Sequence, residues 1–178
     1  MNIYIVVPEG ISFSSENKII PSFAFRQVLD YLKKIIKENS EVYFAPANDF
    51  KTGYYEQNIG SDYFNQIMQG TCISYKTFVA KSNTNNYIDT KLNAKLLMCE
   101  YPSLKKTSVR LLCTSIHLKR AKFCFERNGY KILQAYNIKI TVKKERIVSR
   151  LWYYQYPVIH HIYEKLAYIR DLILLNYK

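Results

Sequence analysis

Short apolar runs alternate along this chain with longer segments of helical periodicity. The runs are predicted strands, and they occupy residues 3–7, 42–45, 76–80, 109–113 and 130–135. The first run is continuous and rich in β-branched residues, which is typical of a strand that is buried on both faces. Because such strands need helices to cover them, the alternation predicts stacked β-α-β units and a largely parallel sheet.

The predicted helices fill the spaces between these strands. The clearest begins at Pro21 and Ser22, and its apolar residues recur with the period of an α-helix. Further helices are predicted at residues 63–68, from Asp89 or Thr90 to about residue 99, from Thr114 and Ser115 to Asn128, and at residues 157–175. The predicted fold is an α/β domain of the Rossmann-like class, with three layers, a mostly parallel sheet and helices on both faces. We assign residues 1–156 to this domain and expect residues 157–178 to form a C-terminal helix that packs on it.

The chain is strongly basic. Lysine and arginine number 26 against 14 acidic residues, which gives a formal net charge of +12. This balance favours an anionic partner, such as a nucleotide, a phosphosugar, nucleic acid or an acidic lipid. Many of the lysines are dispersed along the chain, as is usual for a solvated surface, so charge alone does not choose among these partners.

Several familiar chemistries lack their residues in this sequence. The glycine-rich dinucleotide motif, the P-loop, the nucleophile elbow of α/β-hydrolases and the zincin motif are all absent. The four cysteines match no metal-binding spacing, so we expect buried, reduced thiols and no metal site. Neither a signal peptide nor an apolar stretch of membrane-spanning length occurs, which makes the cytoplasm the expected location.

The best candidate site follows the strand at residues 109–113. In open parallel sheets, ligands bind outside the carboxyl ends of the strands, where helix N-termini present free amides. Here Thr114 and Ser115 supply hydroxyls and amides, and His117 and Arg120 share one face of the next helix. We expect Arg120 and the two amides to bind an anion, and His117, whose ordinary pKa is about 6.5, to act as general acid or base.

Both catalytic candidates also have a structural interpretation. His117 is equally consistent with a helix-start histidine that bonds a backbone carbonyl. Arg120 is equally consistent with a strut that pairs with a carboxylate such as Asp89 or Glu9. The position of the two residues, after a buried strand and on the side of the crevice, favours the functional interpretation for the pair.

Polar residues in the neighbouring loops complete the predicted site. Thr90 and Asn93 open the preceding helix and are expected to contact the ligand. A carboxylate that partners His117 is also expected, because a hydrogen bond to one ring nitrogen determines whether the other nitrogen carries a proton. The candidates for it are Glu9, Asp49 and Glu56.

Two segments have a recognisable pattern: residues 89–94 read Asp-Thr-Lys-Leu-Asn-Ala, and residues 114–121 read Thr-Ser-Ile-His-Leu-Lys-Arg-Ala. They resemble the T-x-x-N-A helix start and the T-S-x-H-x-x-R-A motif of the YdcF/SanA/ElyC-like bacterial family. Further similarities are Arg26, the turn at residues 128–130 and Glu164 in the C-terminal helix. The resemblance implies a Rossmann-like fold with a polar crevice, which is proposed to bind S-adenosylmethionine or a related nucleotide, and a link to envelope polysaccharide metabolism.

Two loops depart from the pattern of that family. Residues 8–10, Pro-Glu-Gly, stand where a glycine-rich turn is usual, and residues 45–47, Ala-Pro-Ala, stand where Ser-Gly-Gly is usual. The strand ends and the resemblance together define the predicted ligand-binding residues. They are Glu9, Gly10, Arg26, Thr90, Asn93, Thr114 and Ser115.

The leading functional hypothesis is a site for a nucleotide-type or phosphorylated small metabolite, with hydrolysis or group transfer as the reaction. One alternative is a binding or regulatory module that holds such a ligand without turnover. The other is nucleic-acid binding by the aromatic residues at 152–157 with Arg146 and Arg150, although such aromatic residues more often anchor the helix that follows them.

The C-terminal helix carries an apolar stripe and a mixed polar face. The stripe consists of Ile159, Ile162, Leu166, Ile169 and Ile173. Glu164 and Asp171 mix with basic residues on the polar face, which disfavours binding to a membrane surface. Adjacent histidines on a helix point about 100° apart, so His160 and His161 are expected to be structural rather than to share a site.

Overall fold

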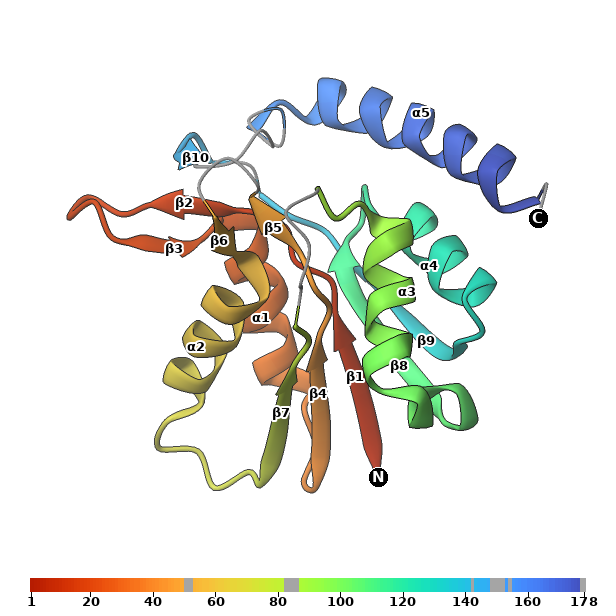
Figure 1. The fold of residues 1–178 in the computed structure, drawn as a ribbon. Helices are drawn as coiled ribbons and strands as arrows, with labels where there is room; N and C mark the ends of the chain where they lie inside the picture. The colour runs from red at the N-terminus through yellow and green to blue at the C-terminus, as the bar shows by residue number, and fades with distance from the viewer. Residues whose placement is uncertain (50–52, 82–86, 142, 148–152, 154, 177–178) are drawn as a thin grey trace.

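A five-stranded parallel sheet forms the centre of the protein. The computed structural model describes the chain except residues 50–52, 82–86, 142, 148–152, 154 and 177–178. The strands lie in the order β7-β4-β1-β8-β9, and their carboxyl ends meet at one edge of the sheet (Figure 1). They are β1 (Asn2–Val6), β4 (Ser40–Phe44), β7 (Tyr75–Val79), β8 (Ser108–Thr114) and β9 (Lys131–Ile138). The five predicted runs form these five strands, and the predicted Rossmann-like α/β fold is confirmed.

Helices cover both faces of this sheet because the side chains of each strand alternate between the faces. Tyr4 and Val6 of β1 pack into one core with the first two helices, and Ile3 and Ile5 pack into a second core with the next two. The first pair is α1 (Phe23–Ile35) and α2 (Glu56–Met68), and the second is α3 (Thr90–Glu100) and α4 (Leu118–Arg127). The Ser22 and Asp89 side chains accept hydrogen bonds from backbone N–H groups in the first turns of α1 and α3, so both predicted helix starts are confirmed.

Two predicted boundaries are wrong. The helix predicted at residues 63–68 begins earlier, at Glu56. The helix predicted to start at Thr114 and Ser115 starts at Leu118, with His117 in the N-cap position. Thr114 is instead the last residue of β8, and its carbonyl oxygen accepts a hydrogen bond from His117 N at 3.2 Å. A tight turn therefore separates the strand from α4.

Small antiparallel sheets occupy regions in which the sequence predicted no strand. Two- and three-residue strands carry no recognisable periodicity, so their pairing could not be expected from the sequence. One small sheet joins β2 (Ile11–Phe13), β3 (Ile19–Pro21) and β10 (Arg146–Ile147), and the other joins β5 (Asn48–Asp49) and β6 (Tyr54–Tyr55). A short 3-10 helix, η1 (Pro102–Lys106), follows α3.

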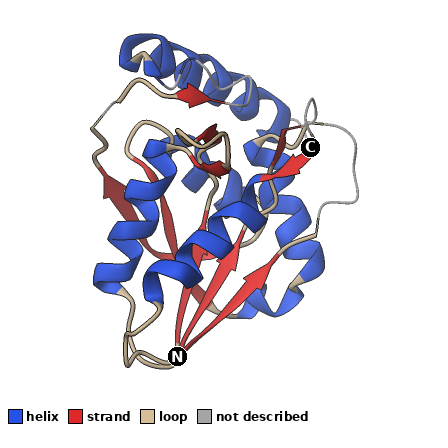
Figure 2. Ribbon diagram, turned by 90° about the vertical axis from the view of Figure 1, so that its left-hand side faces the viewer, coloured by secondary structure: helices blue, strands red, loops and turns tan. Residues whose placement is uncertain are grey.

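The C-terminal helix α5 (Pro157–Asn176) lies across the carboxyl edge of the sheet (Figures 1 and 2). It contacts α4, where the rings of Phe123 and Tyr168 meet edge to face with their centres 5.5 Å apart. Its buried side chains are mostly polar, namely His160, Glu164, Ala167 and Asp171, whereas its apolar stripe is exposed. In the part of the chain that the structure describes, no helix is long and apolar enough to cross a membrane.

The prediction of buried thiols is wrong for two of the four cysteines. Cys113 and Cys124 are buried, whereas Cys72 and Cys99 are exposed. All four are free thiols. Among the described residues, no group of histidine, cysteine or acidic side chains is arranged to hold a metal ion.

Candidate functional site

The predicted site residues meet where the order of the strands reverses. The chain passes from β1 outward through β4 to β7, and then returns to the other side of β1 to form β8 and β9. Ligands of open α/β sheets bind at such a switch point, outside the carboxyl ends of the strands. Glu9 follows β1, and His117 follows β8, which pairs directly with β1. The two residues are therefore placed at the switch point from opposite sides.

Glu9, His117 and Thr90 form a continuous hydrogen-bonded relay. Nδ1 of His117 lies 3.3 Å from Oε1 of Glu9, and Nε2 lies 2.8 Å from the hydroxyl oxygen of Thr90. A carboxylate can only accept, so Nδ1 carries a proton, and in the neutral ring Nε2 accepts the hydrogen of the Thr90 hydroxyl. Each of the three residues is at most 5% exposed. Glu9 is thus the carboxylate partner of His117 among the three candidates.

Arg120 connects this relay to α5. Its Nη2 donates to the Thr90 hydroxyl oxygen at 2.6 Å, and its Nη1 donates to Oε1 of Glu164 at 2.8 Å. Its Nε donates to Oδ2 of Asp171 at 3.1 Å. The guanidinium therefore pairs with carboxylates, as the structural interpretation expects, but these belong to Glu164 and Asp171 rather than to Asp89 or Glu9.

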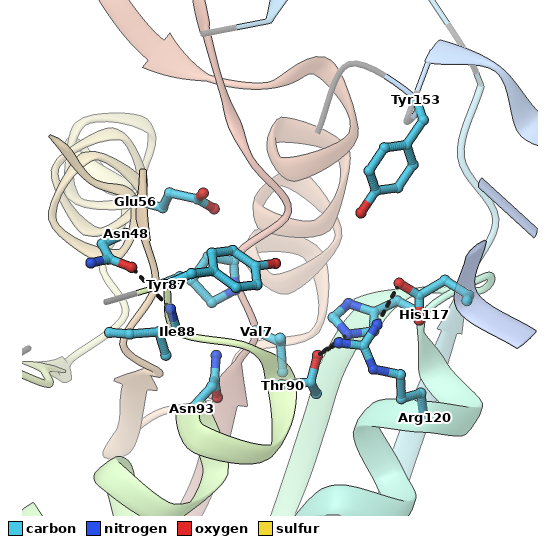
Figure 3. A pocket seen from close by; sticks show the side chains of 13 residues that line it. Val7, Asn48, Glu56, Tyr87, Ile88, Thr90, Asn93, His117, Arg120 and Tyr153 are labelled. Carbon is cyan, nitrogen blue, oxygen red and sulfur yellow. Dashed lines mark hydrogen bonds and ion pairs between the residues drawn. The ribbon is translucent and has the colours of Figure 1, made fainter. Parts of the chain in front are cut away.

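A small polar cavity lies in front of the relay (Figure 3). Thr90 and Asn93 of α3 form its floor in this view, and His117 and Arg120 lie on the side of α4. Glu56 faces them from the start of α2, and the Tyr153 hydroxyl points down into the space. The cavity encloses about 30 Å³, which is room for roughly one or two water molecules.

Two oxygen atoms that line the cavity have no hydrogen-bond partner among the described residues. They are Oδ1 of Asn93 and Oε2 of Glu164, and both are buried. Buried polar atoms in native proteins are almost always hydrogen-bonded to protein or to ordered water. Because both atoms are acceptors, the cavity is built to receive groups that donate hydrogen bonds.

The neighbouring charges raise the pKa of His117 above its ordinary value of 6.5. Burial alone lowers the pKa, because the interior disfavours the charged ring. The carboxylates of Glu164 and Glu9, together with the hydrogen bond to Glu9, outweigh burial, and Arg120 opposes them. The ring therefore takes up a proton more readily than a free histidine does.

The pKa of His160 is shifted in the opposite direction, below its ordinary value. Its side chain is fully buried beside Tyr153, and burial lowers its pKa to about 4. His161, its neighbour in sequence, is exposed. The two histidines therefore point in different directions, as the helical geometry predicts.

The lowered pKa of His160 predicts a specific dependence of stability on pH. As the pH falls below 6.5, the unfolded chain protonates His160 before the folded protein does, so the folded state loses stability. At pH 5 we expect this loss, relative to pH 8, to reach about 2 kcal/mol. Urea unfolding at both pH values should show that the natural protein and His161→Gln lose about 2 kcal/mol more than His160→Gln. The raised pKa of His117 adds an opposite change, but all three proteins share it. An equal loss in all three proteins would contradict the prediction.

The remaining predicted ligand-binding residues are not all at the cavity. The amides expected to bind an anion are already engaged, because Thr114 N donates to Oε1 of Glu9 at 2.7 Å and Ser115 N donates to the Ile138 carbonyl oxygen at 2.8 Å. Ser115 lines a separate groove between α4 and α5. Arg26 lies at the start of α1, where it donates to the Pro21 carbonyl oxygen at 2.8 Å, and it does not line the cavity.

The loops after β1 and β4 meet through Gly10. Its N–H donates to Oε2 of Glu56 at 2.9 Å, and its φ of 88° is one that glycine adopts readily. Glu56 thus holds the turn that carries Glu9. Asp49 belongs to β5, which pairs with β6.

Sequence reasoning missed several residues of the site, among them Asn48, Tyr87, Tyr153 and Asp171. The first three line the cavity, and Asp171 pairs with Arg120. Tyr153 belongs to the aromatic run at residues 152–157, which was assigned to stacking on nucleic acid or to anchoring the next helix, and no local pattern connects any of the four residues with the site. Of the residues proposed to stack on nucleic acid, Trp152 and Tyr154 fall outside the described residues, and so does Arg150.

No protein-family model matches the chain, and no curated protein or solved structure matches it either. The resemblance to the YdcF/SanA/ElyC-like family therefore stays a prediction that rests on the two motifs quoted for it.

Proposed function

We propose that this protein is an enzyme that hydrolyses a small nucleotide-type or sugar metabolite, or transfers a group from it. The observation that carries the proposal is the Glu9–His117–Thr90 relay at the switch point of the sheet. A hydroxyl within hydrogen-bond reach of an imidazole, which is itself oriented by a carboxylate, is the arrangement that activates a nucleophile. Thr90 is the proposed nucleophile, and His117 is the proposed general base.

Arg120 supports this role of Thr90. Its guanidinium donates to the same hydroxyl oxygen at 2.6 Å. A buried cation beside an oxygen favours the development of negative charge on it, which is what attack by a hydroxyl requires. Arg120 is held in this position by Glu164 and Asp171, so it acts in the proposal as a positioning residue.

The proposed reaction has two balanced steps. In the first, the Thr90 oxygen bonds to the electrophilic centre of the substrate while its proton moves to Nε2 of His117, and the leaving group departs with that proton. In the second, water or an acceptor hydroxyl gives a proton to Nε2 and takes the transferred group, and Thr90 recovers its hydrogen from His117. Glu9 keeps its hydrogen bond to Nδ1 throughout and stabilises the protonated ring.

The lining of the cavity supports a substrate that donates hydrogen bonds. The unpaired oxygens of Asn93 and Glu164 suit the hydroxyls of a sugar or ribose, or the amino group of a nucleoside or of S-adenosylmethionine. Since the amides of Thr114 and Ser115 are engaged, any phosphate of the metabolite lies outside this cavity in the proposed complex.

The substrate enters only if the cover of the cavity moves. A space of about 30 Å³ is far smaller than the roughly 300–1,000 Å³ of ordinary ligand pockets. Glu164 of α5 lines the cavity, and Tyr153 lies above it in Figure 3. We therefore propose that the arrangement described here is the closed form of the site.

A binding module without turnover is the second candidate. The near-complete burial of Glu9, Thr90 and His117 favours it, because a relay that is shielded from solvent can also serve only to hold the fold. The two candidates differ in whether the Thr90 hydroxyl reacts.

Replacement of the Thr90 hydroxyl tests the proposal directly. A panel of chromogenic esters, phosphates and glycosides, with nucleotide sugars and S-adenosylmethionine, serves to find a substrate, and a fluorophosphonate probe reports a reactive hydroxyl without one. Thr90→Val, which keeps the shape of the side chain, should lower kcat/KM by about a hundredfold or more and abolish labelling. Thr90→Ser should keep both.

The control is Thr77→Val, which makes the same change in β7, away from the cavity lining. It should leave turnover and labelling intact. If Thr90→Val reacts as well as the natural protein, Thr90 is not the nucleophile. Ligand binding without turnover or labelling in any of these proteins would favour the binding module instead.

A further inference from the structure

The outward face of α5 is an exposed apolar surface. Leu166, at the middle of the helix, is 63% exposed, and its neighbours along the stripe are exposed to a similar degree. The exposed apolar residues of the helix are Val158, Ile159, Ile162, Leu166, Ile169, Ile173 and Leu174. Contiguous apolar surfaces of this kind mark interaction sites, because water solvates them poorly.

The inward face of α5 explains why this stripe is not buried. Glu164 and Asp171 point toward the domain and pair with Arg120 at 2.8 and 3.1 Å. Turning the stripe inward would separate these buried ion pairs and leave Arg120 without its carboxylates, which is strongly unfavourable. The exposure of the stripe is therefore a consequence of the buried ion pairs.

The same pairing removes acidic side chains from the outward face. Glu164 and Asp171 are the only acidic residues of the helix, and both are buried. Lys165 is exposed beside the stripe, and Arg170 is exposed there while it pairs with Asp89 and Asp171. The expectation of a mixed polar face is thus wrong for the surface that solvent meets, which is apolar and basic.

A groove between α4 and α5 continues this surface. It has a volume of about 420 Å³, and Ile169 belongs both to the groove and to the stripe. Its lining combines apolar side chains with Lys119, Lys165 and the ion pair of Arg120 with Glu164. The Lys119 ammonium lies 4.7 Å from the centre of the Tyr168 ring. The groove therefore combines apolar side chains with two lysines, while the carboxylate of its lining is paired with Arg120.

We propose that this outward face of α5, with the adjoining groove, binds the surface of a membrane that contains anionic phospholipids. Helices that lie in a membrane interface combine an apolar face with flanking lysine or arginine, as this one does. A second copy of the chain fits less well, because a symmetric contact along the stripe brings Lys165 toward the lysine of its partner without an acidic residue of α5 to pair with it. The net charge of +12, like the lysines of this face, attracts the protein to an anionic surface.

Flotation of the full-length protein with lipid vesicles tests this proposal. Vesicles of phosphatidylcholine alone are compared with vesicles in which phosphatidylglycerol replaces part of it, at low and at moderate salt. We expect binding to the anionic vesicles only, with a loss at moderate salt. Leu166→Ser should weaken that binding about tenfold or more, because a buried leucine side chain contributes strongly to insertion.

Leu133→Ser is the matched control. Leu133 lies on β9 and is 62% exposed, almost the same as Leu166, but it is remote in sequence from α5. The Leu133→Ser variant should bind vesicles as the natural protein does. An unfolding temperature equal to that of the natural protein in both variants would show that the fold is intact. Lys165→Glu should also weaken binding to the anionic vesicles.

Three outcomes would overturn the proposal. They are no binding to either vesicle, equal loss of binding in Leu166→Ser and Leu133→Ser, and a dimer in light scattering that Leu166→Ser dissociates. The last outcome would identify a second copy of the chain as the occupant of the face. None of these measurements depends on Thr90, so they leave the test of the proposed enzyme separate.

Discussion

Replacement of Arg120 with methionine is expected to lower the free energy of unfolding by about 3–5 kcal/mol. Arg120 is 4% exposed, and it joins Thr90 of α3 to Glu164 and Asp171 of α5. Methionine fills much of the space but leaves Glu164 with its charge buried and uncompensated, whereas Asp171 keeps Arg170. The penalty comes mainly from that uncompensated charge rather than from the lost hydrogen bonds.

Chemical denaturation of Arg120→Met and Lys122→Met measures this effect. Lys122 lies on the same helix, and its ion pair with Glu126 is 3.7 Å long and half-exposed, so its loss should cost about 0.5 kcal/mol or less. Adding Glu164→Gln to Arg120→Met should recover part of the lost stability, because it removes the stranded charge. If Arg120→Met is no less stable than Lys122→Met, the buried ion pairs do not hold α5 on the domain.

Replacement of His117 with glutamine is expected to lower kcat/KM by about 10²–10⁴-fold, while ligand affinity changes little. Glutamine can still accept a hydrogen bond from Thr90, but it cannot take up the proton that the hydroxyl must lose. Turnover and a thermal-shift titration of the same ligand separate the two quantities. His161→Gln, an exposed change three residues before Glu164, should leave both unchanged.

The pH dependence of turnover provides an independent check. A general base works in its neutral form, so kcat/KM should rise with pH through the pKa of His117, which lies above 6.5. Glu9→Gln removes one of the carboxylates that raise this pKa and should move the acidic limb to lower pH. An acidic limb that lies below 6.5 in the natural protein, or that Glu9→Gln leaves in place, would show that His117 is not the base.

The fold could be predicted because its determinants are local in the sequence. β1 is a run of β-branched residues, and Phe25, Val28 and Leu29 of α1 recur with the period of a helix. Similar patterns occur along the rest of the chain, and the period of each pattern indicates a strand or a helix. Helix starts at Ser22 and Asp89 were predictable for the same reason, since a capping side chain acts within one turn. The short strands of the small sheets were not, because they depend on pairing between distant segments.

The candidate site was predictable in part. Thr90, His117 and Arg120 follow from the rule that ligands bind at the carboxyl ends of parallel strands, and the structure brings them together. The partner of His117 did not follow, because Glu9 lies 108 residues away and competed with Asp49 and Glu56. A pattern along the chain cannot decide which of three distant loops approaches a given ring.

By itself the sequence determined that this chain forms a parallel α/β sheet, that His117 and Arg120 follow its fourth strand in chain order, and that residues 157–175 form an amphipathic helix. Only the tertiary structure decided which face of that helix turns inward. The apolar stripe predicts burial, yet Glu164 and Asp171 take the inward side because Arg120 is buried beneath them. Burying Arg120 without its carboxylates would cost more free energy than leaving the isoleucines exposed to water. That comparison depends on contacts that only the folded chain creates.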